Sequence, residues 1–569
     1  MGLCELRNLA IAGCRRLLSE ANRDPYAPAY GCFDRRYWAW KLVDYPEATY
    51  QRGVYPLAWL LRDLGGSQPE AAQTLADAVR AGLAFSARIQ HRDGSFDQAF
   101  PHEHSFGATA FLLHELLQAY RSVRDACSPA ERERAEGCLR RAADFLRRHD
   151  ETHGHIANHL AGAALGLLES AELFGDGRYE RRAEALLGSI LRHRSGEGWF
   201  LEYEGADPGY QTLALHYLAH VYRLRPTPAL REALGQAVEF LAWFVHPDGT
   251  YGGEYGSRRT AIFYPGGFAL LAREFPTARS VLRAMLAAIA ERRTPTLESM
   301  DIGNVAPLLA TYLAALDAHL PDEGLDGPPL PCEREDACQD FPAAGLFVRG
   351  TPAYYAVLGA SNGGVLKVFD RPRRVPLWND GGYVGQETGG AQVTTQATDL
   401  GRPCRASAAE ITLQAPFYYA PRSLPTPARF VLLRLLNLTL MRSPRLGNWV
   451  KGLLVRRLIT RKRPAPLSLT RSLRFEATQV VLTDVVRLAR RRRLDWLEFG
   501  RPFVAIHMAL SRYFENFPSA AMLWAGPSCP ASSARRACPV DVAALLDSGE
   551  ARTEVVISAD RGPLVERWR

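Results

Sequence analysis

Three residues, Asn158, His159 and Tyr210, combine the side chains needed to move a proton next to a carboxylate. Tyr210 follows Asp-Pro-Gly, a turn that leads into a predicted helix, and Asn158-His159 begins an earlier predicted helix. An amide can hold a carboxylate, whereas a phenol and an imidazole can transfer protons. The combination suits removal of the proton beside the carboxylate of a uronate sugar.

This chemistry sets three requirements. The C5 proton of a uronate is weakly acidic until its carboxylate is neutralised, and Asn158, Arg258 and Arg259 are candidates for that clamp. The base must have a pKa near neutrality, which His159 or a tyrosine flanked by cations can provide. Tyr210 fits the acid that protonates the 4-oxygen leaving group. Elimination would yield an unsaturated sugar, whereas return of a proton from the opposite face would epimerise C5.

Other side chains of the helical region are candidates for binding the sugar: His104, Trp199, Glu204, Tyr255, Arg258 and Arg259. The two arginines end a glycine-rich, aromatic loop that begins at Tyr251. The catalytic candidates also have structural interpretations. Asn158 could cap a helix, His159 could be a hydrogen-bonded histidine at the core edge, and Tyr210 could line an amphipathic helix wall.

The spacing of His153, His155 and His159 is compatible with metal binding, because residues four apart share a helix face. No acidic partner follows at close spacing. The sequence therefore predicts no metal site, and no cofactor.

Residues 1 to about 320 show apolar positions at the i, i+3, i+4 and i+7 spacing of helices. The clearest predicted helices are 70–89, 105–123, 129–148, 157–174, 178–193, 209–224, 228–245 and 276–291. Two connecting turns share the pattern His-x-Asp-Gly-(Ser/Thr)-aromatic, at His91 and at His246, and Gly196–Phe200 is a looser third copy. Helical hairpins separated by such turns are typical of an α/α toroid, whose turns build a cleft on one face.

The pattern changes around residues 320–341, which are rich in Pro, Gly and Asp. Short β-branched runs follow, at 353–358, 364–369, 391–396, 407–413, 479–486, 503–510 and 554–558, and they indicate an antiparallel β-sandwich. We predict a toroid domain over 1–325, a linker over 326–345 and a sandwich over 346–569. A basic helical insertion is expected at about 425–463.

The chain of 569 residues has a formal net charge of +8, and 65 of its 69 basic residues are arginine, as is typical of GC-rich genomes. The excess is local, because residues 411–475 hold 13 Lys and Arg and no Asp or Glu. This segment favours a polyanion or an anionic membrane surface as partner. We expect an anionic polysaccharide or oligosaccharide and no nucleic acid.

The first ten residues include Glu5 and Arg7 and do not resemble a signal peptide, and no charge-free apolar run is long enough to span a bilayer. We therefore expect a cytoplasmic protein that contacts the inner membrane, with the periplasm as the alternative. The ten cysteines show no CxxC spacing. Free thiols are favoured, although Cys332–Cys338 or Cys529–Cys538 could bridge in an oxidising compartment.

With its Asn-His segment and its later Glu…Tyr segment, the chain resembles the heparinase II/III-like polysaccharide lyases, which include uronate epimerase relatives. The resemblance covers nearly the whole chain in architecture and two short segments in motif. It implies that Asn158 neutralises the uronate carboxylate and that His159 takes part in proton transfer. Tyr210 would be the general acid, and in some members the same tyrosine is also the base.

One departure concerns the second proton carrier. The family often adds a histidine from the sandwich, but only His507 follows the predicted linker here, and the segment 377–383 has none. Either Tyr210 would then be both acid and base, or Tyr383 would be the second carrier, or the chemistry of the family would be changed or lost in this protein. The zinc site that some members hold in the sandwich is also not expected.

Three functions compete with a lyase. The first is a uronate C5-epimerase, which would use the same residues. The second is a glycoside hydrolase, which would need a pair of cleft carboxylates drawn from Glu204, Asp207 and Glu254. The third is a non-catalytic protein that binds or assembles glycans in surface polysaccharide biosynthesis.

Overall fold

The computed structural model describes residues 3–64, 68–321, 325–420, 426–443, 446–447, 449–450, 462–489, 494–500, 538–540, 542–560 and 562–565. Several sequence predictions lie outside these residues: the strand at 503–510, His507, Cys529 and most of the insertion beyond residue 443. Among the helices that the structure describes, none has both the length and the apolar character required to cross a bilayer.

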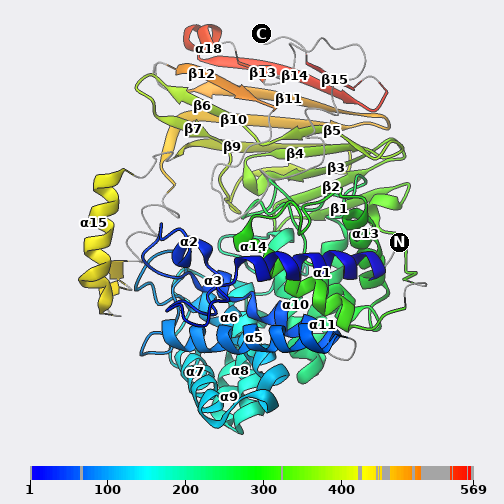
Figure 1. Cartoon of the computed structure of the whole chain (residues 1–569). Coiled ribbons are helices and arrows are strands. Elements are labelled where there is room, and N and C mark those ends of the chain that lie inside the picture. Colours follow the sequence, from blue (N-terminus) through cyan, green and yellow to red (C-terminus); the bar gives the residue numbers. More distant parts are fainter. Residues whose placement is uncertain are drawn as a thin grey trace.

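The N-terminal half of the chain folds into helices, as predicted (Figure 1). They are α1 (Leu3–Glu20), α2 (Arg35–Trp38), α3 (Ala48–Gln51), α4 (Val54–Leu64), α5 (Pro69–Ile89), α6 (Phe106–Val123), α7 (Pro129–Arg148), α8 (Ala157–Phe174), α9 (Gly177–Arg192), α10 (Pro208–Leu224), α11 (Pro228–Ala242), α12 (Gly266–Leu271), α13 (Pro276–Ala290) and α14 (Ile302–Asp317). Capping residues determine where many of these helices begin and end. Ser128 and Glu131 form a capping box at the start of α7, and Gly175 ends α8 in the left-handed conformation.

The predicted turn repeat is confirmed by its backbone geometry. In the turns that begin at His91, Ser195 and His246, the first N–H bonds the carbonyl four residues later, and a glycine three residues later bonds back. The three glycines have φ values of 87–98°. Glycine is required for a second reason at Gly94 and Gly198, because a Cβ would lie 1.9 Å and 2.3 Å from backbone carbonyl oxygens of α7 and α11.

The C-terminal half forms two antiparallel sheets, as predicted. The first has the order β1-β2-β3-β4-β5, with β1 (Ala337–Phe341), β2 (Leu346–Gly350), β3 (Tyr354–Gly359), β4 (Val365–Asp370) and β5 (Val375–Asp380). The second has the order β13-β12-β6-β7-β9-β10-β11-β14-β15, with β8 also on β9. Its strands are β6 (Val384–Glu387), β7 (Gln392–Thr394), β8 (Cys404–Ala406), β9 (Glu410–Ala420), β10 (Pro464–Phe475), β11 (Gln479–Leu488), β12 (Leu494–Phe499), β13 (Cys538–Pro539), β14 (Glu550–Ser558) and β15 (Gly562–Val565).

The first sheet is the middle layer of three, between the helices and the second sheet (Figure 1). Alternate residues of β3 show this arrangement: Tyr354, Ala356 and Leu358 belong to the core between the sheets, whereas Tyr355 and Val357 belong to the core shared with the helices. Burial of both faces explains why this strand is continuously apolar. The helical domain and the sandwich are therefore packed through a common apolar layer.

Two expectations need correction. β1 lies inside the stretch predicted to be a linker, so the sandwich begins at Ala337 rather than at residue 346. Tyr383 is fully buried between the sheets, where its hydroxyl donates to Asp484 at 2.7 Å, and it is therefore not the second proton carrier.

Cys332 and Cys338 are free thiols.

Candidate active site

Asn158, in the first turn of α8, is held by a carboxyl group that sequence reasoning overlooked. A β-bridge pairs Ile156, the residue before α8, with Glu202. The Asn158 Nδ2 donates to Glu202 Oε1 at 2.6 Å, and both side chains are buried. The other oxygen of Glu202, Oε2, has no hydrogen-bond partner among the described residues. Asn158 is thus fixed in orientation, and Glu202 keeps one oxygen for another group.

Burial raises the pKa of Glu202 to about 8, and the charge of Asp207 adds to this rise, although the hydrogen bond from Asn158 and the charge of Arg258 oppose it. The raised pKa favours the protonated form of Glu202 near neutral pH, and in that form the carboxyl group can donate a hydrogen bond to a carboxylate. An ionised Glu202 would repel the same carboxylate. Protonation makes this position suitable for an acidic sugar.

The raised pKa predicts an effect on stability. Between the ordinary glutamate pKa of about 4.3 and about 8, the folded protein keeps a proton that the unfolded chain has lost, so stability falls as pH rises through this window. We expect Glu202→Gln to remove this contribution, so that its melting temperature falls less than that of the wild type between about pH 5 and about pH 8. Glu204→Gln is the matched control, and the same pH dependence in wild type and Glu202→Gln would contradict the assignment.

Tyr210, in the first turn of α10, is positioned by the cap of that helix. The buried carboxylate of Asp207 accepts the Tyr210 backbone N–H at 2.9 Å and that of Arg258 at 2.7 Å, so one group fixes both residues. The pKa of Tyr210 is well above its usual value, first because of burial and then because Tyr264 and Tyr203 lie nearby. The phenol therefore carries its proton and suits a general acid.

Arg258 presents a buried cation to this region. Its side chain is 6% exposed, and its guanidinium carbon lies 3.9 Å from the centre of the Tyr203 ring. Its Nε and Nη2 atoms have no hydrogen-bond partner among the described residues. A buried guanidinium with two unused donors can bind an anion, and a carboxylate or sulfate suits its geometry best.

His159 forms a second hydrogen-bonded unit. Its Nδ1 lies 2.6 Å from Glu151 Oε2, and the other oxygen of Glu151 lies 2.8 Å from His153 Nδ1. Burial alone would raise the pKa of Glu151, but the hydrogen bonds from His153 and His159 bring it well below its usual value. An ionised carboxylate on Nδ1 orients the imidazole and leaves Nε2 as the nitrogen for proton transfer.

The His159 ring also depends on a glycine of α6. A Cβ at Gly107 would lie 2.5 Å from the ring, so only glycine fits there without a shift. Phe111, one turn later, contacts the ring edge-on. Helix α6 is therefore the wall against which His159 rests.

Tyr203 connects the two units. Its phenol lies within electrostatic range of Arg258, Glu202 and Glu151. Its φ of 61° is unusual for a residue other than glycine and turns the chain sharply after Glu202. The structure thus brings together Asn158, Tyr210 and Arg258 from the sequence prediction, adds Glu202 and Tyr203, and places His159 with Glu151 alongside.

Other predicted binding residues are used inside the protein, and this corrects the expectation for them. Tyr255 is fully buried, with its hydroxyl 2.9 Å from His246 Nε2, and Trp199 is nearly so. Arg259 points into the domain interface, where Nη2 donates to Asn362 Oδ1 and to the Gln396 carbonyl, both at 3.2 Å. These side chains offer little surface to a sugar.

Glu204 and His104 remain partly accessible. Glu204 pairs with Lys462 of the sandwich domain at 2.8 Å. His104 contacts Ser95 and Asp93 through Nδ1 and lies beside two further histidines.

The carboxylate pair that a glycoside hydrolase requires is missing from this set. The carboxylate of Asp207 is buried and caps α10 by accepting backbone hydrogen bonds. Glu254 is fully buried and pairs with Lys367 at 2.8 Å. Glu204 alone of the three expected carboxylates has an exposed face. The described geometry therefore does not favour a hydrolase.

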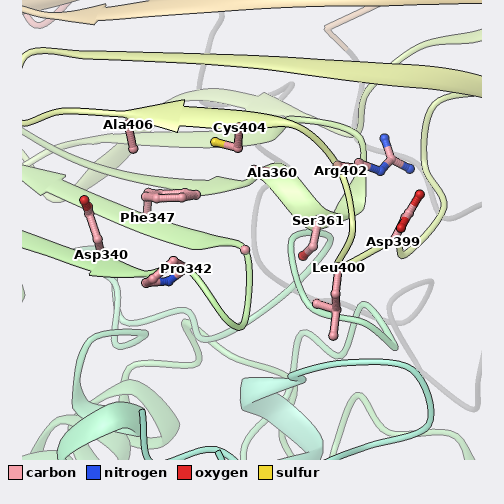
Figure 2. Close-up of a pocket in the computed structure, with 11 residues that line it drawn as sticks. Asp340, Pro342, Phe347, Ala360, Ser361, Asp399, Leu400, Arg402, Cys404 and Ala406 are labelled. Carbon is pink, nitrogen blue, oxygen red and sulfur yellow. The ribbon is translucent and has the colours of Figure 1, made fainter. Parts of the chain in front are cut away.

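A cavity of about 340 Å³ lies in the sandwich rather than at the acid–base residues. Figure 2 shows Asp399, Arg402 and Leu400 at one end of it, and Asp340, Phe347 and Ala406 at the other. The end at Leu400 approaches the turn that follows Tyr203, because a Cβ at Gly205 would lie 3.6 Å from Leu400 Cδ2. The cavity thus borders the candidate site from the sandwich side.

Comparison with known proteins agrees with this architecture. The family model of the ulvan lyase N-terminal domain matches residues 48–267, which include every acid–base candidate above. No curated protein matches the sequence significantly.

Two solved structures share the fold at low identity. The chondroitin AC lyase of Streptomyces coelicolor A3, solved with chondroitin sulphate, is 12% identical with a TM-score of 0.53, and the match covers 87% of this chain and 67% of that one. A Paenibacillus xanthan lyase is 10% identical with a TM-score of 0.52, and the match covers 87% of this chain and 46% of that one. The predicted fold, a helical toroid followed by a β-sandwich, is confirmed and is shared with these two polysaccharide lyases.

Proposed function

We propose that the protein cleaves a uronate-containing polysaccharide by β-elimination, because residues 48–267 match the family model of the ulvan lyase N-terminal domain and the fold is shared with two polysaccharide lyases. The observation that carries this proposal is the buried Arg258 guanidinium, which keeps two nitrogens without partners next to Tyr210 and Tyr203. The carboxylate of an acidic sugar would pair with Arg258, close to Tyr210, the proposed general acid.

The carboxylate clamp has a charged and a neutral part. Arg258 compensates the charge of the uronate carboxylate, and the protonated Glu202, held by Asn158, donates a hydrogen bond to it. As the C5 proton leaves, negative charge spreads into the carboxyl group, so the clamp binds the transition state more strongly than the ground state.

Two groups move protons. His159 takes the C5 proton on Nε2, since Glu151 holds Nδ1. The electrons of the C5–H bond form the C4=C5 double bond, the C4–O bond breaks, and the leaving oxygen takes the phenolic proton of Tyr210. Exchange with water then returns a proton to Tyr210 and removes one from His159.

The proposal is tested by the ultraviolet absorbance of the unsaturated uronate product. We would incubate the full chain with ulvan, chondroitin and dermatan sulfate, heparan sulfate, hyaluronan, alginate and glucuronan. A rise on one polymer identifies the substrate class. A flat trace on every polymer contradicts a lyase acting on this panel.

Epimerisation uses the same proton abstraction without cleavage and is distinguished by isotope. Incubation in deuterated water would place deuterium at C5 of an intact polymer if the enzyme is an epimerase. A lyase would shorten the polymer instead. Binding without cleavage or deuterium uptake would indicate a glycan-binding protein.

A second surface favours contact with a membrane. The helix α15 (Pro427–Leu438) projects beside the helical domain, where Arg434 pairs with Asp44 at 3.0 Å (Figure 1). It exposes the apolar side chains of Phe430, Val431, Leu432, Leu435 and Leu438. The segment 411–475 contains 13 Lys and Arg and no Asp or Glu. Three of these cations already have acidic partners elsewhere in the chain, because Arg434 pairs with Asp44, Lys462 with Glu204, and the buried Arg471 with Asp380 and Asp484. We propose that α15 lies on an anionic bilayer surface.

We expect the protein to float with vesicles that contain anionic lipid and not with zwitterionic vesicles. The Leu432→Ser/Leu435→Ser variant should lose flotation, because it removes apolar area that the bilayer buries, and added salt should weaken the binding of the wild type. Equal flotation of the variant and the wild type would contradict a role for α15.

A further inference from the structure

Three histidines outside the proposed acid–base residues lie together in the connection between α5 and α6. His91 begins the first Asp-Gly turn, and His102 and His104 lie just before α6. One ligand atom from each of the three falls within 4.8 Å of the others. The His91 and His104 ring centroids are 4.3 Å apart, and those of His91 and His102 are 5.5 Å apart. Three nitrogen ligands at this separation are close enough to hold one ion between them.

Two carboxylates orient the rings from behind. His91 Nε2 lies 2.8 Å from Asp97 Oδ2, and His104 Nδ1 lies 2.8 Å from Asp93 Oδ2. A metal-binding histidine almost always directs its other ring nitrogen to such a carboxylate, which fixes the tautomer and raises the basicity of the ligating nitrogen. Asp93 and Asp97 are therefore placed as outer-sphere partners rather than as ligands.

The backbone of this loop is also held in an uncommon conformation. His102 and His104 have φ values of 60° and 53°. The carboxylate of Asp97 accepts their backbone N–H groups at 2.8 Å and 3.0 Å, so it stabilises both turns as well as the His91 ring. Left-handed residues other than glycine are uncommon and cluster at functional sites. Here they direct two imidazoles toward the third.

We propose that His91, His102 and His104 bind one divalent transition-metal ion of the zinc class. Three neutral imidazoles suit zinc, cobalt, nickel and copper rather than magnesium or calcium, which prefer oxygen ligands. Three protein ligands leave a fourth tetrahedral position for water or a ligand oxygen. A cavity of about 70 Å³ adjoins the cluster, with His102, His104, His149 and His153 in its lining, and gives that position room.

The ion would also support the proposed active site. Ser105 caps α6 directly after His104, and Gly107 in the first turn of α6 is the residue on which the His159 ring rests. Fixing His104 therefore fixes the wall behind His159. In this respect the inference rests on the proposed function, but metal binding itself does not require turnover.

The test uses the full chain after removal of metals by a chelator. Calorimetric titration with Zn²⁺ should show one site per chain, and Co²⁺ should produce the visible absorption bands of a tetrahedral complex. His102→Asn and His104→Asn should each abolish stoichiometric binding. Asparagine can adopt the left-handed backbone conformation, but it has no imidazole nitrogen to bind the metal. Asp93→Asn should weaken binding ~10–100-fold.

His149→Gln is the matched control, because His149 lines the same cavity but lies outside the cluster. It should bind Zn²⁺ as tightly as the wild type, and Zn²⁺ should raise the melting temperature of both but not of His102→Asn. If either His102→Asn or His104→Asn does not fold, the Zn²⁺ binding of the other variant tests the proposal. Absence of Zn²⁺ and Co²⁺ binding in the wild type, or unchanged binding in both asparagine variants, would overturn the proposal, whereas a lyase-negative protein that binds Zn²⁺ would overturn only the function.

Discussion

Tyr210→Phe is expected to lower the turnover of the unsaturated product ~10²–10⁴-fold, with substrate affinity nearly unchanged. The substitution removes one hydroxyl from the first turn of α10 and leaves the backbone bond to Asp207 in place. The phenol is the acid in the proposed mechanism, and its raised pKa keeps it protonated across the neutral range. Turnover is measured by ultraviolet absorbance and affinity by calorimetry with the polymer.

Tyr222→Phe is the control for this change. Tyr222 lies on the same helix, but its hydroxyl donates to Glu274, away from the candidate site. We expect wild-type turnover from this variant. Substantial turnover by Tyr210→Phe would remove Tyr210 from the acid role.

Arg258→Gln is expected to lower kcat/KM ~10²–10³-fold, because one donor to a developing anion is typically worth this much. The buried guanidinium gains a partner only when an anion binds, so the loss should appear in both KM and kcat. Esterification of the uronate carboxylate makes the test sharper. An esterified polymer should be a poor substrate for the wild type, and Arg258→Gln should distinguish the two polymers much less.

Arg231→Gln is the matched control, since Arg231 is an exposed arginine that pairs with Glu274. It should retain wild-type kinetics. If Arg258→Gln discriminates between the free and the esterified polymer as strongly as the wild type does, Arg258 is not the clamp. Comparison of melting temperatures separates this result from a loss of fold, because Arg258 also stacks on Tyr203.

Much of the fold could be predicted because its signals are local. Helices α7 and α8 begin and end where the apolar spacing, a capping box and a terminal glycine indicate. The Asp-Gly turns repeat in structure as they do in sequence. The strand β1 was missed because it lies directly after a proline-rich stretch, and its pairing with β2 is a tertiary contact.

The sequence by itself determined which segments are proposed to carry chemistry: Asn158-His159, the segment up to Tyr210 and the loop that ends in two arginines. Only the tertiary structure decided which of two neighbouring side chains in a loop faces the candidate site. The turn at Tyr203 directs Glu202 to Asn158 and Glu204 to Lys462, and a positive φ at Arg259 accompanies its turn into the domain interface while Arg258 stays beside Tyr203. Residue types and spacing fix what a side chain can do, whereas its direction in a loop depends on backbone angles set by contacts distant in the chain.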